Sequence, residues 1–261
     1  MSRNVTSGLY RLYANRLRRE LAHTETLPRH VAVVMDGNRR WARRAGLGNP
    51  SLGHRQGAEH LDDLLGWCEG LGITHVTVFV CSTENLARRD ADEITFLMNV
   101  ITDLANRVAA DEHPNWSLHL AGIVDTLPDH TAYALKQAVA ATESASTGNH
   151  VTLAVGYGGR QEVLDAFRDL LLDKAAEGAD LRQVAETLTA DDIASRLYNA
   201  DQPEPDLIIR TSGEQRLSNF LLWQSAYSEL YFCDAYWPAF REVDFLRALR
   251  SYAARSRRFG A

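Results

Sequence analysis

Arginines, glycines and small polar residues follow short apolar runs at four places in this chain of 261 residues. The four segments are residues 36–41, 81–85, 156–160 and 210–218. Guanidinium forks and glycine-backed amides pair well with phosphate oxygens, and helix N-termini add a favourable dipole. One such segment is usually ordinary surface charge, but four of them together indicate a site for phosphorylated ligands.

Asp36 stands between an apolar run and a glycine turn, and its carboxylate has two interpretations. In the structural one it caps the helix that follows, which is a common role for aspartate. In the functional one it holds a hard cation that bridges diphosphate oxygens, a setting that Mg²⁺ prefers. We favour the second interpretation, because a cap alone would not explain the neighbouring Asn-Arg-Arg-Trp sequence.

Several well-known site motifs are missing from the sequence. It has no GxxxxGK[ST], no complete GxGxxG, no GxSxG and no HExxH. It also lacks the DDxxD cluster of the all-helical trans-prenyl synthases. The net charge of −6 and the pI near 5.8 argue against a general nucleic-acid or anionic-membrane binder. Affinity for anions must therefore come from local arginines.

The elements that position these residues follow from the hydrophobic pattern. Short apolar runs alternate with amphipathic segments, which is typical of βαβ units on a parallel sheet. We therefore expect one α/β domain over residues 1–261, with a mostly parallel six-stranded sheet flanked by helices. Ligands bind beyond the carboxyl ends of such strands, where the four polar segments lie. The expected strands are residues 31–35, 75–80, 118–121, 151–155, 207–210 and 229–232.

Residues 1–27 are expected to form an N-terminal helix and a lead-in. The helix is basic and amphipathic. Because its apolar face is small, we expect it to pack on the body of the protein and to make at most a peripheral contact with a membrane. The chain has three cysteines without a CxxC, no apolar stretch of spanning length and no export-signal pattern. These features predict a cytoplasmic protein.

Together the motifs resemble the cis-prenyltransferases, the undecaprenyl diphosphate synthase family, from about His30 to Gly260. They occur in family order and at the ends of the expected strands. The resemblance implies a hydrophobic tunnel between sheet and helices. The motifs are HVAVVMDGNRRW at 30–41, GHRQG at 53–57, STEN at 82–85, YGGR at 157–160, IRTSGEQRLSNFLLWQ at 209–224, YSELYF at 227–232 and RFG at 258–260.

The resemblance implies an enzyme that condenses isopentenyl diphosphate with dimethylallyl, geranyl or farnesyl diphosphate in the cis configuration. Asp36 and Asn85 would be catalytic, Asp36 beside the diphosphates and Asn85 in proton removal. Asp36 and Glu229 would hold Mg²⁺. The 258–260 segment would reach across a homodimer. The substrate-binding residues would be Gly37, Asn38, Arg39, Arg40, Trp41, His54 and Arg88 for the allylic diphosphate, Ser82, Thr83, Glu84 and Leu86 at the mouth, and Arg210, Arg216, Leu217 and Ser218 for isopentenyl diphosphate.

The sequence departs from the family pattern at a few positions. Pro50 stands where an arginine is usual, which puts one diphosphate contact in question, and Arg39 replaces a glycine nearby. Leu86 replaces a common tryptophan, and Arg89 stands where proline is typical.

Product length depends on the tunnel. Val80 stands where a small residue is frequent, and Met98 and Ile101 would lie on a tunnel-facing helix, although such stripes are more often plain core. Val80, Leu86 and the missing arginine resemble the short-chain actinobacterial branch, which makes (2Z,6E)-farnesyl diphosphate. One alternative is a long-chain synthase of decaprenyl or undecaprenyl diphosphate. Another is a non-catalytic activating subunit, which the retained acidic and arginine motifs disfavour.

Overall fold

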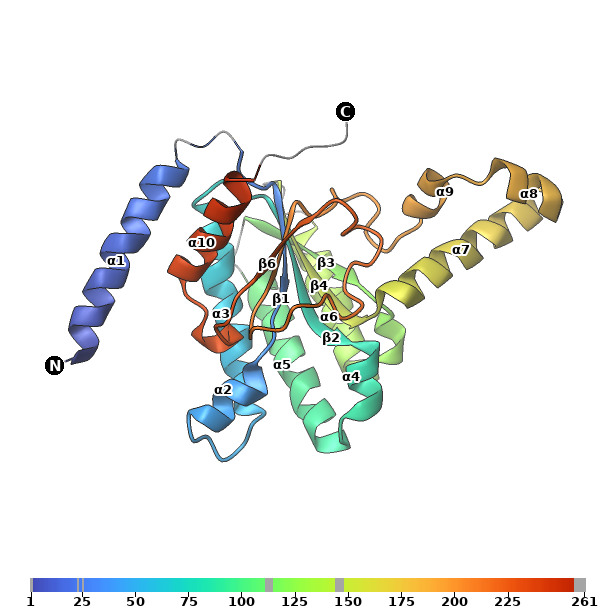
Figure 1. The fold of residues 1–261 in the computed structure, drawn as a ribbon. Helices are drawn as coiled ribbons and strands as arrows, with labels where there is room; N and C mark the ends of the chain where they lie inside the picture. Colours follow the sequence, from blue (N-terminus) through green and yellow to red (C-terminus); the bar gives the residue numbers. More distant parts are fainter. Residues whose placement is uncertain (1, 23, 25, 111–114, 144–147, 256–261) are drawn as a thin grey trace. The chain divides into compact units, whose positions relative to one another are not determined.

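Six strands form one sheet in the structure, a computed structural model that describes residues 2–22, 24, 26–110, 115–143 and 148–255 (Figure 1). Their order in the sheet is β3-β4-β2-β1-β5-β6, and the pairs β1–β5, β5–β6 and β3–β4 are parallel. The predicted six-stranded α/β fold is thus confirmed. The strands are β1 (His30–Val34), β2 (His75–Ser82), β3 (Trp116–Ala121), β4 (Asn149–Tyr157), β5 (Leu207–Arg210) and β6 (Glu229–Phe232).

The burial of the strands explains why their sequences are continuous apolar runs. All five residues of β1 and all four of β5 are buried, as expected for strands covered on both faces. In the register of this pair, Val31 lies beside Leu207 and Val34 beside Arg210. Both strands therefore end at the same edge, and the residues that follow them are delivered to one place.

The contacts within the chain divide it into two compact units. The first comprises Met1–Val76, Pro205–Arg216 and Ser228–Ala261, and the second comprises Thr77–Glu204 and Leu217–Tyr227. The chain passes between the units several times without a linker. A single domain over residues 1–261 stays a prediction.

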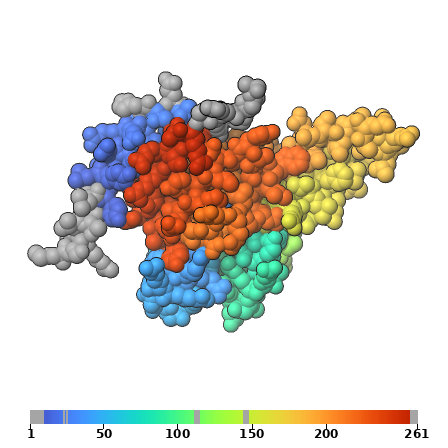
Figure 2. Space-filling model, viewed as in Figure 1, coloured from blue at the N-terminus to red at the C-terminus, as the bar shows by residue number. Residues whose placement is uncertain are grey.

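In the first unit, α1 (Ser2–Leu21) packs along α10 (Glu242–Ala253), as the neighbouring blue and red segments of Figures 1 and 2 show. Leu17 and Leu21 are buried there, and Arg18 forms an ion pair with Glu242. The interpretation of this segment as a packed helix is confirmed. The unit also contains α2 (Asn38–Arg44), α3 (Leu52–Glu69) and the short 3-10 helix η2 (Trp237–Ala239).

The second unit contains most of the helices. α5 packs against α6 and β3, and its Met98 and Ile101 are fully buried in this core. The tunnel that they were expected to line stays a prediction. The helices are α4 (Thr83–Arg88), α5 (Ala91–Ala109), η1 (Val124–Thr126), α6 (Asp129–Thr142), α7 (Gly159–Ala176), α8 (Leu181–Thr187) and α9 (Ala190–Ala194).

Across the described parts of the chain, none of the helices combines the length and the apolar character needed to cross a bilayer. The 258–260 segment, expected to reach across a dimer, lies outside the described residues.

Candidate active site

Asp36 begins the turn that follows β1, and its main chain is held on two sides. Its amide donates to the Thr211 hydroxyl at 2.9 Å, and that hydroxyl donates to the Asp36 carbonyl at 2.7 Å. The same carbonyl accepts the Trp237 amide at 3.0 Å. The residue that caps α2 is Gly37, at a φ of 99°, and no side chain caps this helix. The capping interpretation of Asp36 is therefore wrong, and its carboxylate is available for other contacts.

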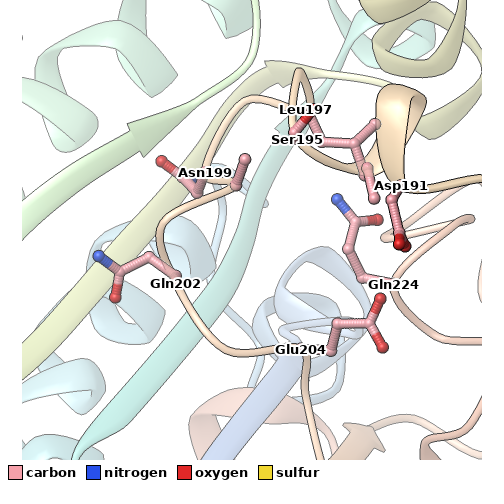
Figure 3. Close-up of a pocket in the computed structure, with 9 residues that line it drawn as sticks. Asp191, Ser195, Leu197, Asn199, Gln202, Glu204 and Gln224 are labelled. Carbon is pink, nitrogen blue, oxygen red and sulfur yellow. The ribbon is translucent and has the colours of Figure 1, made fainter.

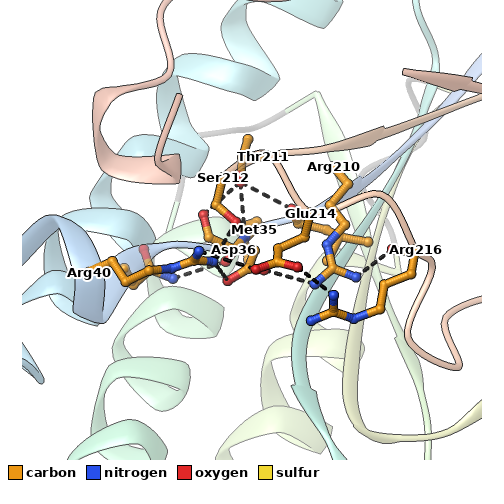
Figure 4. A network of polar contacts seen from close by, with 10 residues as sticks. Met35, Asp36, Arg40, Arg210, Thr211, Ser212, Glu214 and Arg216 are labelled. Atoms are coloured by element: carbon orange, nitrogen blue, oxygen red, sulfur yellow. Dashed lines mark hydrogen bonds and ion pairs between the residues drawn. The ribbon is translucent and has the colours of Figure 1, made fainter. Parts of the chain in front are cut away.

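Two arginines contact the Asp36 carboxylate, one at each oxygen (Figure 4). Nη2 of Arg210 lies 2.8 Å from Oδ2, and Nη2 of Arg40 lies 3.2 Å from Oδ1. Arg40 also donates to the Ser212 hydroxyl at 2.6 Å. Burial by itself would raise the pKa of Asp36. The hydrogen bond and charge of Arg210, helped by Ser212 and Arg40, outweigh burial and hold that pKa below its ordinary value.

A second carboxylate, Glu214, completes this arginine cluster. Its Oε1 lies 3.3 Å from Nη1 of Arg40, and its other oxygen accepts a hydrogen bond from Arg216. Arg210 donates in turn to the main-chain carbonyl of Arg216. We call Asp36, Arg40, Arg210, Glu214 and Arg216 the arginine cluster. It brings together four residues predicted from the sequence and adds Glu214, for which no role was predicted.

The glycines of α3 allow the turn after Asp36 to pack closely. A Cβ at Gly53 would lie 2.1 Å from the Asn38 carbonyl oxygen, and one at Gly57 would lie 2.4 Å from the Asn38 side-chain oxygen. Asn38 donates to the Met35 carbonyl at 3.0 Å. His54 is half-buried between the two glycines on α3. The GHRQG motif thus fits α3 against the start of α2.

Tyr236 supports the same turn, although no role was predicted for it from the motifs. A Cβ at Gly37 would lie 2.7 Å from its ring, so the turn excludes other side chains there. The guanidinium of Arg40 lies 5.6 Å from the ring centroid, within range of a cation–π contact. Of the other residues predicted on α2, Arg39 is exposed and Trp41 is half-buried.

The STEN segment forms a second cluster, which belongs to the second unit. Ser82 ends β2 and caps α4, its hydroxyl accepting the Asn85 amide at 3.0 Å. Asn85 therefore lies in the first turn of α4 and is half-buried, as are Thr83 and Leu86. Arg88 is exposed at the end of the same helix.

Asn219 ties this second cluster together, and sequence reasoning missed it. Its side chain donates to Glu84 at 3.0 Å and accepts the Arg160 amide at 2.9 Å, while its carbonyl accepts the Gly159 amide at 2.8 Å. Burial would raise the pKa of Glu84, but hydrogen bonds from its own amide and from Asn219 lower it overall. Asn219 and Ser218 both have positive φ values, of 66° and 53°. The strained turn holds Ser218 exposed and Leu217 half-buried.

A buried carboxylate anchors the segment that follows this turn. Glu162 on α7 accepts hydrogen bonds from the Tyr157 hydroxyl, the Tyr198 amide at 3.1 Å and the Gln224 side chain at 3.0 Å. Burial raises its pKa despite these donors. The network fixes residues 217–227 to the end of β4, and it accounts for the Gln224 of the family motif.

Glu229 lies far from Asp36 within one chain. Its register partner is Leu207, which pairs with Val31, so Glu229 lies at the amino end of the sheet. Asp36 follows Val31 by five residues, or about 16 Å of strand at about 3.3 Å per residue. Glu229 instead forms an ion pair with Arg255. Within one chain, therefore, the predicted Asp36–Glu229 metal pair is not formed.

Asp36 nevertheless fits a magnesium ion that is held mostly by substrate. Among the described residues, no group of three or more His, Cys, Asp or Glu side chains could form a metal cage. Mg²⁺ is usually bound by one or two carboxylates together with phosphate oxygens and water. The half-buried Asp36, beside arginines suited to phosphate, matches that donor set.

The second unit also contains a separate cavity of about 280 Å³ (Figure 3). No residue predicted from the sequence lines it, so it is not part of the predicted site. Its lining is formed by Asp191, Ala194, Ser195, Leu197, Asn199, Ala200, Gln202, Glu204 and Gln224.

The fold and the arginine cluster define an α/β protein with a group of guanidiniums and carboxylates at the carboxyl edge of a parallel sheet. The sequence profile of the family described as "Putative undecaprenyl diphosphate synthase" matches residues 34–260. The chain belongs to this family of prenyltransferases.

Individual relatives agree with this assignment. The chain is 62% identical to an isoprenyl transferase of Streptomyces fradiae, over 97% of both chains. It is 53% identical to a (2Z,6E)-farnesyl diphosphate synthase of Mycolicibacterium smegmatis, over 96% of this chain and 95% of that one. Lavandulyl diphosphate synthase from Lavandula x intermedia, solved with dimethylallyl diphosphate, superposes with a TM-score of 0.82 at 32% identity, covering 90% of this chain and 99% of that one.

Proposed function

We propose that this protein joins isopentenyl diphosphate to an allylic diphosphate in the Z configuration and releases a product of farnesyl length. The observation that carries the proposal is the arginine cluster at the carboxyl edge of β1 and β5, in which Arg40 and Arg210 contact Asp36 and Arg216 is joined to them through Glu214. Membership of the prenyltransferase family supports the same reaction.

In this reaction, negative charge would develop on a diphosphate bound at the arginine cluster. The allylic carbon–oxygen bond breaks and pyrophosphate leaves, while a carbon–carbon bond forms to isopentenyl diphosphate, which then loses one proton. Negative charge grows on the leaving group, and donors fixed beforehand at that position stabilise the transition state. Arg40, expected at the allylic diphosphate, is suited to this role because its guanidinium is already held by Asp36, Ser212 and Glu214.

Asp36 is the residue that we propose holds Mg²⁺ beside the diphosphates. When bound, the ion would add positive charge that helps to neutralise the leaving pyrophosphate. The low pKa of Asp36 keeps its carboxylate charged at neutral pH.

In the second cluster, we propose that Asn85 receives or relays the proton lost from isopentenyl diphosphate. Ser82 fixes the start of α4 through the Asn85 amide, which leaves the Asn85 side chain to contact substrate. An amide is a weak base, and the released pyrophosphate is a suitable final acceptor for the proton.

The short product rests on named relatives and on bulky residues in this chain. A relative 53% identical is called a (2Z,6E)-farnesyl diphosphate synthase, and one 51% identical is called a short-chain Z-isoprenyl diphosphate synthase. Val80 is half-buried near the end of β2, and its bulk in a tunnel wall would stop a growing chain early.

The homodimer is part of the proposal as well. Because Glu229 lies at the amino edge of its own sheet, a Glu229 carboxylate at the metal would have to be Glu229 of the partner subunit. The thiols of Cys68, Cys81 and Cys233 are all free, which agrees with our proposal that the protein acts in the cytoplasm.

The test is transfer of labelled isopentenyl diphosphate by the purified protein, with dimethylallyl, geranyl or farnesyl diphosphate as starter. We expect products of farnesyl length, and loss of transfer when EDTA removes the metal. Products of decaprenyl or undecaprenyl length would overturn the short-chain proposal but not prenyl transfer. Complete absence of transfer with every starter would point instead to the non-catalytic subunit.

A further inference from the structure

Glu214 holds two of the three guanidiniums of the arginine cluster (Figure 4). One of its carboxylate oxygens faces Arg40 at 3.3 Å, and the other contacts Arg216. The sequence motifs predict that Arg40 binds the allylic diphosphate and that Arg216 binds isopentenyl diphosphate. A single carboxylate therefore bridges residues of the two expected diphosphate positions.

The backbone fixes this carboxylate in place. Ser212 and Gly213 both have positive φ values, of 78° and 77°, and a non-glycine residue adopts such a value only when its surroundings impose it. The Ser212 amide donates to the Ala235 carbonyl at 2.7 Å, and the Gly213 amide donates to the Cys233 carbonyl at 2.9 Å. The tight turn thus directs the next residue, Glu214, toward the end of β1.

The contacts of Glu214 are those that a phosphate oxygen would make. Guanidinium forks bind carboxylates and phosphates with the same donor geometry. Asp36 already contacts Arg40 and Arg210, so Glu214 supplies the anionic partner for Arg216 and the second partner for Arg40. A diphosphate that approaches the Nη1 atoms of both arginines would therefore compete with Glu214 for their donors.

We propose that Glu214 is a positioning residue that occupies the place of a diphosphate oxygen until substrate displaces it. The inference rests on the proposed function, because it takes Arg40 and Arg216 to be diphosphate ligands. Glu214 keeps the guanidiniums extended and ordered in the absence of substrate, and it weakens diphosphate binding by competing for them. Its removal should strengthen ground-state binding of diphosphate and at the same time lower the rate, because the arginines lose their order.

The experiment measures binding of inorganic pyrophosphate by calorimetry to wild-type protein and to the Glu214→Gln variant. Glu214 is 32% exposed, and a partly exposed ion pair contributes only modest free energy. Loss of its two ion pairs, with Arg40 and Arg216, should therefore make pyrophosphate bind roughly threefold to tenfold more tightly to the variant. The matched control is Glu177→Gln, which removes the same charge from an exposed pair with Lys174 in the second unit and should leave binding unchanged.

Steady-state kinetics separate positioning from a merely structural role. We expect Glu214→Gln to lower both the KM for the allylic diphosphate and kcat, whereas general destabilisation would lower only the amount of active protein. If Glu214→Gln fails to fold, Glu214→Asp can be used, because its side chain is shorter by one methylene and its carboxylate lies farther from the arginines. This variant should bind pyrophosphate about twofold more tightly than wild type.

Pyrophosphate binding by Glu214→Gln that equals or falls below that of wild type would overturn the inference, while prenyl transfer by the wild type would leave the proposed function intact. Failure of the folded wild-type protein both to bind pyrophosphate and to transfer a prenyl group would instead remove the proposed function itself.

Discussion

Replacing Asp36 with asparagine tests the central residue of the site without changing its size. The carboxylate is 29% exposed and contacts Arg210, which is 5% exposed, at 2.8 Å. A hydrogen bond to a charged group contributes about 1.5–3 kcal/mol, and asparagine retains part of it, so we expect a loss of about 1–2 kcal/mol in stability. The main-chain contacts of Asp36 with Thr211 and Trp237 do not involve the carboxylate and should persist.

The expected effect on activity is far larger than the effect on stability. Loss of the carboxylate that we propose holds the metal should lower kcat by roughly 10²–10³, as removal of a single transition-state stabiliser does. The melting temperature should fall by roughly 2–8 °C for a chain of this size. The assay pairs isopentenyl transfer with thermal unfolding of the same preparations.

The control is Asp206→Asn at the other end of β1. The Asp206 carboxylate accepts the Arg29 amide at 2.6 Å and the His30 amide at 2.9 Å, so its loss should destabilise the protein while leaving kcat within about threefold. An Asp36→Asn variant that kept more than about a tenth of wild-type transfer would refute the reasoning. So would one that lost its tertiary structure, because Asp36 would then be a scaffold residue.

The pH dependence gives an independent check on Asp36. Its pKa lies below the ordinary aspartate value of about 3.9, so its charge stabilises the folded state fully above that value. This contribution is lost as the pH falls through the folded-state pKa. Denaturant unfolding should therefore show wild type more stable than Asp36→Asn at pH 7, with the difference shrinking only in acid. A difference that had vanished by about pH 6 would contradict the assigned role of Arg210.

Three further substitutions test other parts of the structure. Val80→Ala should lengthen the main product beyond farnesyl, because it removes bulk from the proposed tunnel wall; an unchanged chromatogram would contradict that role. Gly57→Ala should cost about 1–3 kcal/mol in unfolding, because its Cβ would lie 2.4 Å from Asn38, whereas Gly66→Ala on the same helix meets nothing within 4 Å and should be neutral or stabilising. Asn219→Ala should lower kcat about tenfold with a loss of about 1–2 kcal/mol in stability, and wild-type kinetics would show that its contacts are not needed.

The sequence predicted the strands and the edge at which Asp36 and Arg210 meet, for a definite physical reason. Continuous apolar runs can be buried on both faces only in a covered parallel sheet, and parallel strands end at one edge. The same reasoning, applied to Glu229, would have placed it correctly. Glu229 is the first residue of the expected strand 229–232, whereas Asp36 follows the end of a parallel strand. The two residues therefore had to lie at opposite edges of the sheet. The pairing of Asp36 with Glu229 came from the resemblance and not from the strand geometry, and it stays a prediction that needs two chains.

Other features of the site depend on turns that the sequence pattern does not determine. Ser212 and Asn219 adopt positive φ values imposed by contacts with distant segments, and those values decide where Glu214 and Ser218 point. An acidic residue among several arginines gives no local signal of which arginine it will pair with. The order of residues in the motif indicated the family, but the ion-pair partners of the acidic residue became clear only from the fold.

The charges of the arginine cluster indicate why the site should need a cation as well as arginines. Three guanidiniums and two carboxylates leave one positive charge among these five side chains, within a chain whose net charge is −6. Two diphosphates carry several negative charges, which is more than this surplus can offset even if both substrates displace Glu214. A divalent ion on Asp36 would supply the remaining charge where the leaving group develops it. In this account, the contact of Asp36 with Arg210 and Arg40 keeps its carboxylate ionised and oriented for an ion that arrives with the substrates.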